Sequence, residues 1–164
     1  MITPFTIWLT FVLFVFLFCV IKPNAARIFL GFFFLVMAIG INIVTVLFDP
    51  QSYIEMGKNA LIPFYRWVFM NIIRLNPALF VLPIAAFQIT IALMMLNKKK
   101  YVKIGLMGGI MFLLGIAPLG IESLPNLILA VALGWLFRKE FNITFLESMR
   151  AKFIVNKDSM KRFI

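Results

Sequence analysis

Long apolar runs constrain this chain more than any other feature of its sequence. Each run is about 18–21 residues long, and a helix of that length, rising ~1.5 Å per residue, crosses a hydrocarbon layer about 30 Å thick. The runs cover residues 4–21, 28–48, 77–96, 102–119 and 120–137. The chain is 63% hydrophobic and only 13% charged, whereas soluble domains are about half apolar and roughly a quarter charged. The sequence therefore predicts an all-α integral membrane protein with five transmembrane helices.

The fifth run carries the weakest signal. It contains Glu122, and its uninterrupted apolar part, Pro125–Phe137, is short. We expect this helix to need residues 119–124 to reach the far surface. Residues 1–137 then form a transmembrane domain, and residues 138–164 form a separate basic tail.

The basic residues predict the orientation of the chain through the positive-inside rule. If the N-terminus is outside, the inside segments hold 13 of the 16 basic residues and the outside loop holds 3. The outside residues are Lys58, Arg66 and Arg74. The acidic residues divide evenly between the two sides. We predict a multi-pass protein of the cytoplasmic membrane with its N-terminus outside and its C-terminus in the cytoplasm.

The single long loop, residues 49–76, joins the second and third predicted spans. Asp49-Pro50 ends one helix, and Phe64–Leu75 is expected to be helical until Asn76-Pro77. Its tyrosines and Trp67 are typical of a membrane interface. The segment either lies on the outer surface or caps a cavity in the bundle, carrying Arg66 and Arg74 toward it.

The C-terminal tail is basic and amphipathic. Thr144 and Glu147 have the spacing of a capping box, which predicts a helix from about Phe145. The cationic residues expected to contact anionic lipids of the inner leaflet are Arg150, Lys152, Lys157, Lys161 and Arg162. A docking helix for a cytoplasmic partner is the alternative.

Uncharged polar side chains interrupt the predicted spans. The amides are Asn42 on the second helix, Gln88 on the third and Asn126 at the start of the fifth. An unpartnered amide in hydrocarbon costs several kcal/mol, so Gln88 should face the bundle. These residues serve either as interhelical hydrogen-bond glue or as ligand contacts. Glu122 is expected near the outer end, where Arg66 or Arg74 neutralises it.

Several residue types that carry out chemistry are missing. The chain has no histidine and a single cysteine, which excludes the usual zinc sites, histidine acid–base catalysis and a CxxC redox pair. No carboxylate is expected at mid-depth in the membrane. These absences favour a non-catalytic protein with no metal site. The basic charge follows topology, so nucleic-acid binding is not indicated.

The order of the apolar segments resembles that of the DoxX-like family of small membrane proteins. The stretch "ARIFLGFFFLVMAIGINIV" places Arg27, Gly31 and Gly40 where that family has an arginine and two glycines. An interfacial loop, "FQITIALMMLN", "IGLMGGIMFLLG" and "LPNLILAVALGWL" follow in the family's order. The resemblance covers about residues 26–137 and implies a four-helix bundle, to which the first helix of this chain is added.

Two positions depart from the family pattern. Gln88 stands where the family usually has a glutamate, and Asn42 or Ile43 stands where it commonly has a lysine. Both departures remove charge. If the charged pair serves redox or proton chemistry in the family, this chain lacks it. The resemblance also implies an association with membrane redox complexes, because some relatives are subunits of quinone-linked oxidoreductases.

Our leading hypothesis is an accessory or scaffold membrane protein that binds a lipid-like ligand, either a quinone or a phospholipid, or a partner membrane subunit. The ligand-binding residues would be Asn42, Arg66, Arg74, Gln88, Glu122 and Asn126. A ligand with an anionic head and an apolar tail would suit the two arginines. The alternatives are a small transporter or flippase, monomeric or homo-oligomeric, with an outward arginine-lined cavity, and an immunity or membrane-stress protein acting by protein–protein contact.

Overall fold

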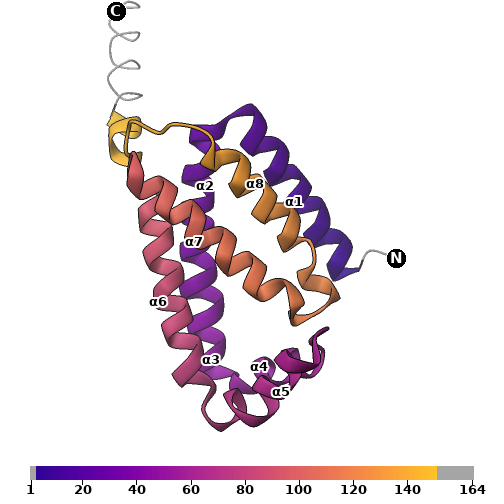
Figure 1. Cartoon of the computed structure of the whole chain (residues 1–164). Helices are drawn as coiled ribbons and strands as arrows, with labels where there is room; N and C mark the ends of the chain where they lie inside the picture. Colours follow the sequence, from indigo (N-terminus) through magenta and orange to yellow (C-terminus); the bar gives the residue numbers. More distant parts are fainter. Residues whose placement is uncertain (1–2, 151–164) are drawn as a thin grey trace, which may run out of the picture.

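A computed structural model describes residues 3–150, and this part of the chain is entirely helical with connecting turns (Figure 1). The α-helices are α1 (Pro4–Ile21), α2 (Pro23–Val36), α3 (Val44–Phe48), α4 (Pro50–Lys58), α5 (Pro63–Asn71), α6 (Pro77–Met95), α7 (Lys100–Ile116) and α8 (Asn126–Phe137). A π-helix, η1 (Met37–Ile43), joins α2 to α3, and the 3-10 turns are η2 (Ile73–Leu75), η3 (Ala117–Leu119) and η4 (Ile121–Ser123).

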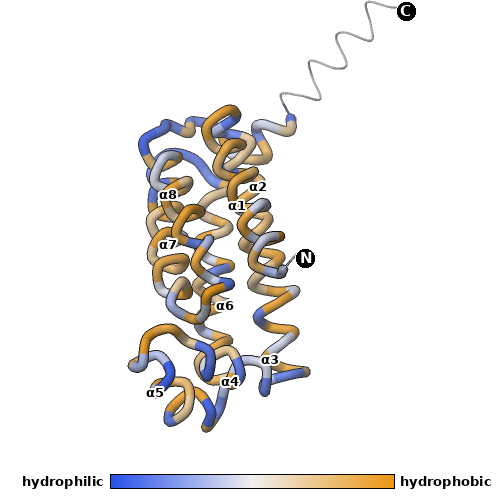
Figure 2. The backbone as a smooth tube through the Cα atoms, turned by 90° about the vertical axis from the view of Figure 1, so that its right-hand side faces the viewer, coloured by the Kyte–Doolittle hydropathy of each residue, from blue (hydrophilic) through white to orange (hydrophobic). Residues whose placement is uncertain are grey.

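Four helical segments are long and apolar enough to cross a membrane. They are Pro4–Ile21, Pro23–Phe48, Pro77–Met95 and Lys100–Leu119. The second begins at Pro23, five residues before the predicted start, because proline is well accommodated in the first turn of a helix. Hydrophilic residues are concentrated toward the two ends of the bundle (Figure 2). The helical membrane class is thereby supported.

The fifth predicted span is only partly helical. Its α-helix, α8, has 12 residues and is preceded by the turn η4 and by Pro125. A 12-residue helix is about 18 Å long, which is less than a hydrocarbon core. A fifth crossing therefore stays a prediction, as does the orientation of the chain.

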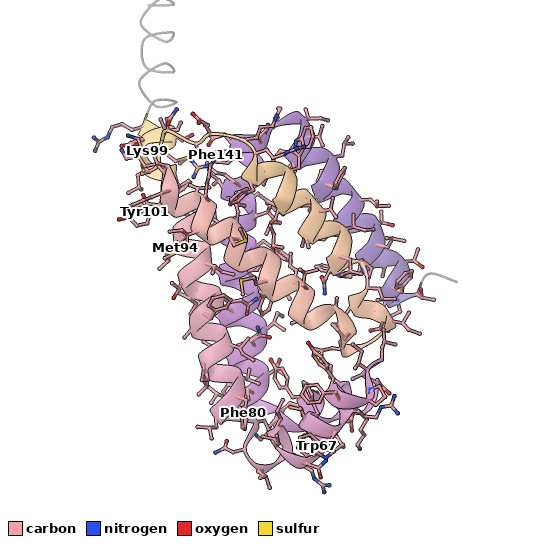
Figure 3. All side chains as sticks on the ribbon, in the orientation of Figure 1. Trp67, Phe80, Met94, Lys99, Tyr101 and Phe141 are labelled. Atoms are coloured by element: carbon pink, nitrogen blue, oxygen red, sulfur yellow. The ribbon has the colours of Figure 1, made fainter. Side chains whose placement is uncertain are left out.

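The long helices form a closed ring. Helix α1 packs against α8, α8 against α7, α7 against α6, and α6 against α2, which in turn contacts α1 (Figure 1). Helices α4 and α5 lie at one end of this ring, which we call the capped end. We call the opposite end, where Lys99, Tyr101 and Phe141 are labelled in Figure 3, the basic end.

Loop 49–76 contains more helix than the sequence predicted. Pro50 ends one helix but also begins another, α4. Proline has no backbone N–H, and this is no loss in the first turn of a helix, where the N–H groups have no partner within the helix. The predicted helix over residues 64–75 is found as α5 followed by η2. The loop is thus two short helices rather than one.

Helices α6 and α7 approach closely at Gly105. A Cβ on Gly105 would lie 2.8 Å from the Ile91 carbonyl oxygen and 2.8 Å from the Met95 amide nitrogen. Both atoms belong to the backbone of α6 and cannot move aside. Small residues allow such contacts between membrane helices, so Gly105 determines the spacing of this pair.

One charged side chain, Arg27 of α2, is completely buried at the basic end. Its Nε donates to the Asn24 side chain at 2.9 Å, and its Nη1 donates to the Met95 carbonyl at 2.8 Å and to the Asn97 carbonyl. Its Nη2 donates to the Ile143 carbonyl. The guanidinium also lies over the Phe141 ring, 5.0 Å from the centroid. A cation at these carbonyls complements the C-terminal end of α6.

The predicted capping box at residues 144–147 is confirmed. The Thr144 amide donates to the Glu147 carboxylate at 2.7 Å, and the Glu147 amide donates to the Thr144 hydroxyl at 3.1 Å. Residues 145–150 are helical. Lys98 pairs with Glu147 at 2.7 Å, and this hydrogen bond lowers the pKa of the Glu147 carboxyl. Arg150 is exposed, whereas Lys152, Lys157, Lys161 and Arg162 lie outside the described residues.

The close approach of α6 and α7 at Gly105 predicts that a larger residue at this position destabilises the fold. Gly105→Ala should lower the free energy of unfolding by about 1–3 kcal/mol, because a methyl group would press into the α6 backbone. Gly115→Ala on the same helix is the control, since a Cβ there meets nothing within 4 Å. Thermal unfolding in detergent would measure both variants. Equal stability of the two would contradict the close approach.

The burial of Arg27 predicts that the fold also loses stability when this side chain is replaced. Arg27→Met keeps the apolar stem but removes every donor, leaving the carbonyls of Met95, Asn97 and Ile143 unpaired. We expect a loss on the order of 3 kcal/mol. Arg138→Met, at an exposed site of the same end, should be nearly neutral. Denaturant titration in mixed micelles would compare the two, and similar small losses would show that the buried contacts contribute little.

Candidate functional site

A cavity of about 420 Å³ lies inside the ring, beneath the capped end. Ligand sites typically have volumes of about 300–1,000 Å³ and mostly apolar walls. Its apolar lining includes Trp8, Phe33, Phe34, Met37, Phe80, Val81, Phe112 and Leu113 from α1, α2, η1, α6 and α7. Its polar lining residues are Asn42, Tyr53, Gln88, Glu122, Ser123 and Asn126. The cavity thus has a hydrocarbon-like interior with a few hydrogen-bonding groups.

The first polar group of the wall is a chain of three side chains. Tyr53 of α4 donates its hydroxyl to Asn42 Oδ1 at 2.9 Å. Asn42 Nδ2 in turn donates to Gln88 Oε1 on α6. Asn42 lies in the π-helix, a distortion that often occurs at functional sites. The chain therefore links the cap, the second span and the third.

The second polar group lies on the other side of the ring. Trp8 of α1 donates its indole N–H to Asn126 Oδ1 at 3.3 Å. Asn126 is the first residue of α8 and is 5% exposed. Both residues line the cavity. This bond joins the shortest helix of the ring to the first.

Helices α4 and α5 close the cavity at the capped end. Tyr53 and Met56 of α4 line the cavity, and so do Phe69 of α5 and Ile73 of η2. The two helices touch closely, since a Cβ on Gly57 would lie 2.2 Å from the Phe69 Cβ. Of the two interpretations of loop 49–76, the structure supports the cap, but without the expected placement of Arg66 and Arg74 toward the cavity.

One backbone and one side-chain hydrogen bond fasten this cap to the end of α7 and to η3, the turn that follows it. The Leu61 amide donates to the Pro118 carbonyl at 2.8 Å, and the Tyr65 hydroxyl donates to the Gly115 carbonyl at 2.9 Å. These contacts hold the segment between α4 and α5 across the ring. The cap is therefore joined to both walls of the cavity, through Tyr53 on one side and residues 61–65 on the other.

The predicted site residues separate into two groups. Asn42, Gln88, Glu122 and Asn126 line the cavity, while Arg66 and Arg74 do not. Both arginines are exposed, and Arg66 donates to the Ala60 carbonyl at 3.1 Å. Within residues 3–150 the ion pair found is Lys98–Glu147. The expected pairing of Glu122 with either arginine is therefore not formed.

Among the lining residues that the sequence analysis missed, two take part in the hydrogen bonds of the site. From the sequence, Trp8 is an aromatic residue of a membrane helix, and Tyr53 is an aromatic residue typical of a membrane interface. Tyr53 and Met56 are three residues apart and so share a face of α4, which is the signal that the sequence contains. That this face turns toward Asn42 depends on how the cap folds back.

Burial raises the pKa of the Tyr53 hydroxyl from its ordinary value of 10 to about 12. The neutral phenol is therefore the form that the fold favours. The neutral hydroxyl donates to Asn42 Oδ1, and in this arrangement Asn42 offers its amino group to Gln88.

No match to this chain is found among protein-family models, curated proteins or solved structures. Its function must therefore be argued from its own residues.

The raised pKa of Tyr53 predicts a distinct titration. One of the three tyrosines should ionise near pH 12, and this step should be missing in Tyr53→Phe. The stabilisation that comes from burying the neutral phenol is complete below pH 10 and is lost as the pH rises to about 12. Tyrosinate absorbance would follow the titration, with circular dichroism to confirm that the helices persist. A wild-type titration that shows no difference from Tyr53→Phe near pH 12 would contradict the burial.

Proposed function

We propose that this chain is a small accessory membrane protein that binds a lipid-like molecule, a quinone or a phospholipid, in the cavity beneath the cap. The observation that carries the proposal is the composition of the cavity wall, which combines an apolar lining with a small set of buried amides. Such a wall suits a molecule with an apolar body and a small polar group.

The proposal includes the orientation predicted from charge. With the N-terminus outside, the cap and the cavity lie toward the outer leaflet, and the basic end faces the cytoplasm. Lys22, Lys99, Lys100 and Arg150 are exposed at that end, where anionic head groups of the inner leaflet would attract them.

The DoxX-like resemblance belongs to the same proposal. The two positions where this chain departs from the family pattern, Asn42 and Gln88, are hydrogen-bonded to each other. If the family's lysine and glutamate occupy the positions of Asn42 and Gln88, those two charged residues would also contact each other. In this chain the pair is neutral, which favours ligand binding over proton or redox chemistry at that point.

A transporter with an arginine-lined cavity is less favoured. Neither Arg66 nor Arg74 is among the described residues that line the cavity, and the charged residue there is Glu122. A scaffold for a partner subunit remains the competing function, and the experiment that follows separates the two.

Lipid analysis of the purified chain tests the proposal. Extraction and mass spectrometry after purification in mild detergent should yield about one quinone or phospholipid per chain. Val81→Trp should abolish this retention, because Val81 lines the cavity and is 6% exposed. Leu82→Trp is the matched control, since Leu82 is next to Val81 in the chain but faces outward and is 38% exposed.

Size-exclusion chromatography and circular dichroism would establish that both tryptophan variants are folded. A wild-type chain without stoichiometric lipid, together with a co-purifying membrane subunit, would overturn ligand binding in favour of the scaffold.

A further inference from the structure

Gln88 is left with an unpaired amino group at the cavity. Its side chain is 2% exposed, and its oxygen is occupied by the hydrogen bond from Asn42. Its Nε2 has no hydrogen-bond partner among the described residues. No fully enclosed side-chain nitrogen or oxygen there lacks a partner, so Nε2 must retain some accessible surface. Because Gln88 lines the cavity, we place that surface on the cavity.

Asn126 has the same arrangement on a different helix. Its oxygen accepts from Trp8, its side chain is 5% exposed, and its Nδ2 has no partner within residues 3–150. It also lines the cavity. Two buried amides on α6 and α8 therefore both have their oxygens occupied by protein donors and their amino groups unpaired.

The electrostatics of the wall add a second constraint. Its polar lining contains no lysine or arginine among the described residues, and its charged member is Glu122, which is exposed at the rim. An anionic group inside the cavity would have no cation to compensate its desolvation. The polar group that enters should therefore be neutral.

We infer that the cavity selects its ligand by carbonyl oxygens, with Gln88 Nε2 and Asn126 Nδ2 as the donors. The inference rests on the proposed function, because it names the chemical class of the molecule bound there. A neutral carbonyl accepts N–H hydrogen bonds and brings no charge into the apolar interior. The ring carbonyls of a quinone and the ester carbonyls of a phospholipid both supply this chemistry.

Alcohols and amines fit the two unpaired amino groups less well than a carbonyl does. An alcohol could accept through its hydroxyl oxygen, but its own proton would have to share amide oxygens that already accept from Asn42 and Trp8, so it gains less from this wall than a carbonyl does. A protonated amine offers donors only. Trp8 fixes the orientation of Asn126, because an indole N–H can donate but cannot accept and so must meet the amide oxygen.

Matched ligand pairs test the inference on the wild-type chain. The first pair is a diacyl phosphatidylcholine, which has no net charge, and its dialkyl ether analogue, which lacks the carbonyls. The second pair is a short-tailed benzoquinone and the alkylbenzene with the same tail. Binding to the delipidated full-length protein in detergent would be measured by native mass spectrometry. We expect the carbonyl member of at least one pair to bind about tenfold more tightly per hydrogen bond gained.

Two variants then assign the donors. Gln88→Met preserves the length of the side chain and Asn126→Leu its approximate size, and each removes one amino group. Each variant should reduce the preference for the carbonyl member by about tenfold. Thr90→Val is the matched control, because Thr90 is on α6, is exposed and bonds its own helix at Ala86. It should leave the preference unchanged.

The outcomes separate the two levels of the proposal. Equal binding of both members of each pair would overturn carbonyl selection while leaving a lipid-binding cavity in place. Failure of every ligand to bind, with no lipid retained on purification, would overturn the cavity's function as well. Preference for the ester pair alone or the quinone pair alone identifies which source of carbonyls the cavity takes. Because the ligand pairs are compared on the wild-type chain, a variant that fails to fold does not remove the test.

Discussion

A buried guanidinium maintains the basic end of the bundle. Arg27 is surrounded by protein on all sides, and in an apolar environment its charge is tolerable only because carbonyl groups accept its hydrogen bonds. Those carbonyls come from the last residue of α6, from the turn after it and from residue 143. The same turn receives the Phe145 amide at the Leu96 carbonyl. The second span, the third span and the segment after α8 are thus joined at one point, which fixes the register of the ring.

At the capped end the polar interactions are of a different kind. Here the helices separate enough to leave a cavity of about 420 Å³, and neutral amides rather than a charge connect them. The hydrogen bonds of Asn42 and Trp8 use the amide oxygens of Gln88 and Asn126. The buried charge at the basic end is therefore satisfied by protein groups, whereas the capped end leaves amide donors at a space large enough for a ligand. That asymmetry is the physical basis of both proposals.

Particular residues show how far the sequence could predict these features. Helices α1 and α6 begin where predicted, at Pro4 and Pro77, because proline and the adjacent Thr3 and Asn76 caps are local signals. The π-helix over Met37–Ile43 was not predicted. The short uninterrupted part of the fifth run, Pro125–Phe137, matches α8, but the expected extension through residues 119–124 contains the separate turn η4. Arg27 was counted as one of the inside charges and as part of the family resemblance. Its burial was not predicted, because an arginine next to an apolar run gives no sign of whether it faces water or protein.

The sequence by itself indicated the helical membrane class, the capping box at Thr144 and five apolar spans, four of which are found as long helices, since each of these depends on residues close together in the chain. Only the tertiary structure decided which polar side chains meet. Asn42 and Gln88 are 46 positions apart, and Trp8 and Asn126 are 118 apart. Whether such residues face each other depends on the rotation of each helix about its axis, and close approaches such as that at Gly105 restrict that rotation. The candidate site is therefore a property of the assembled ring and not of any one segment.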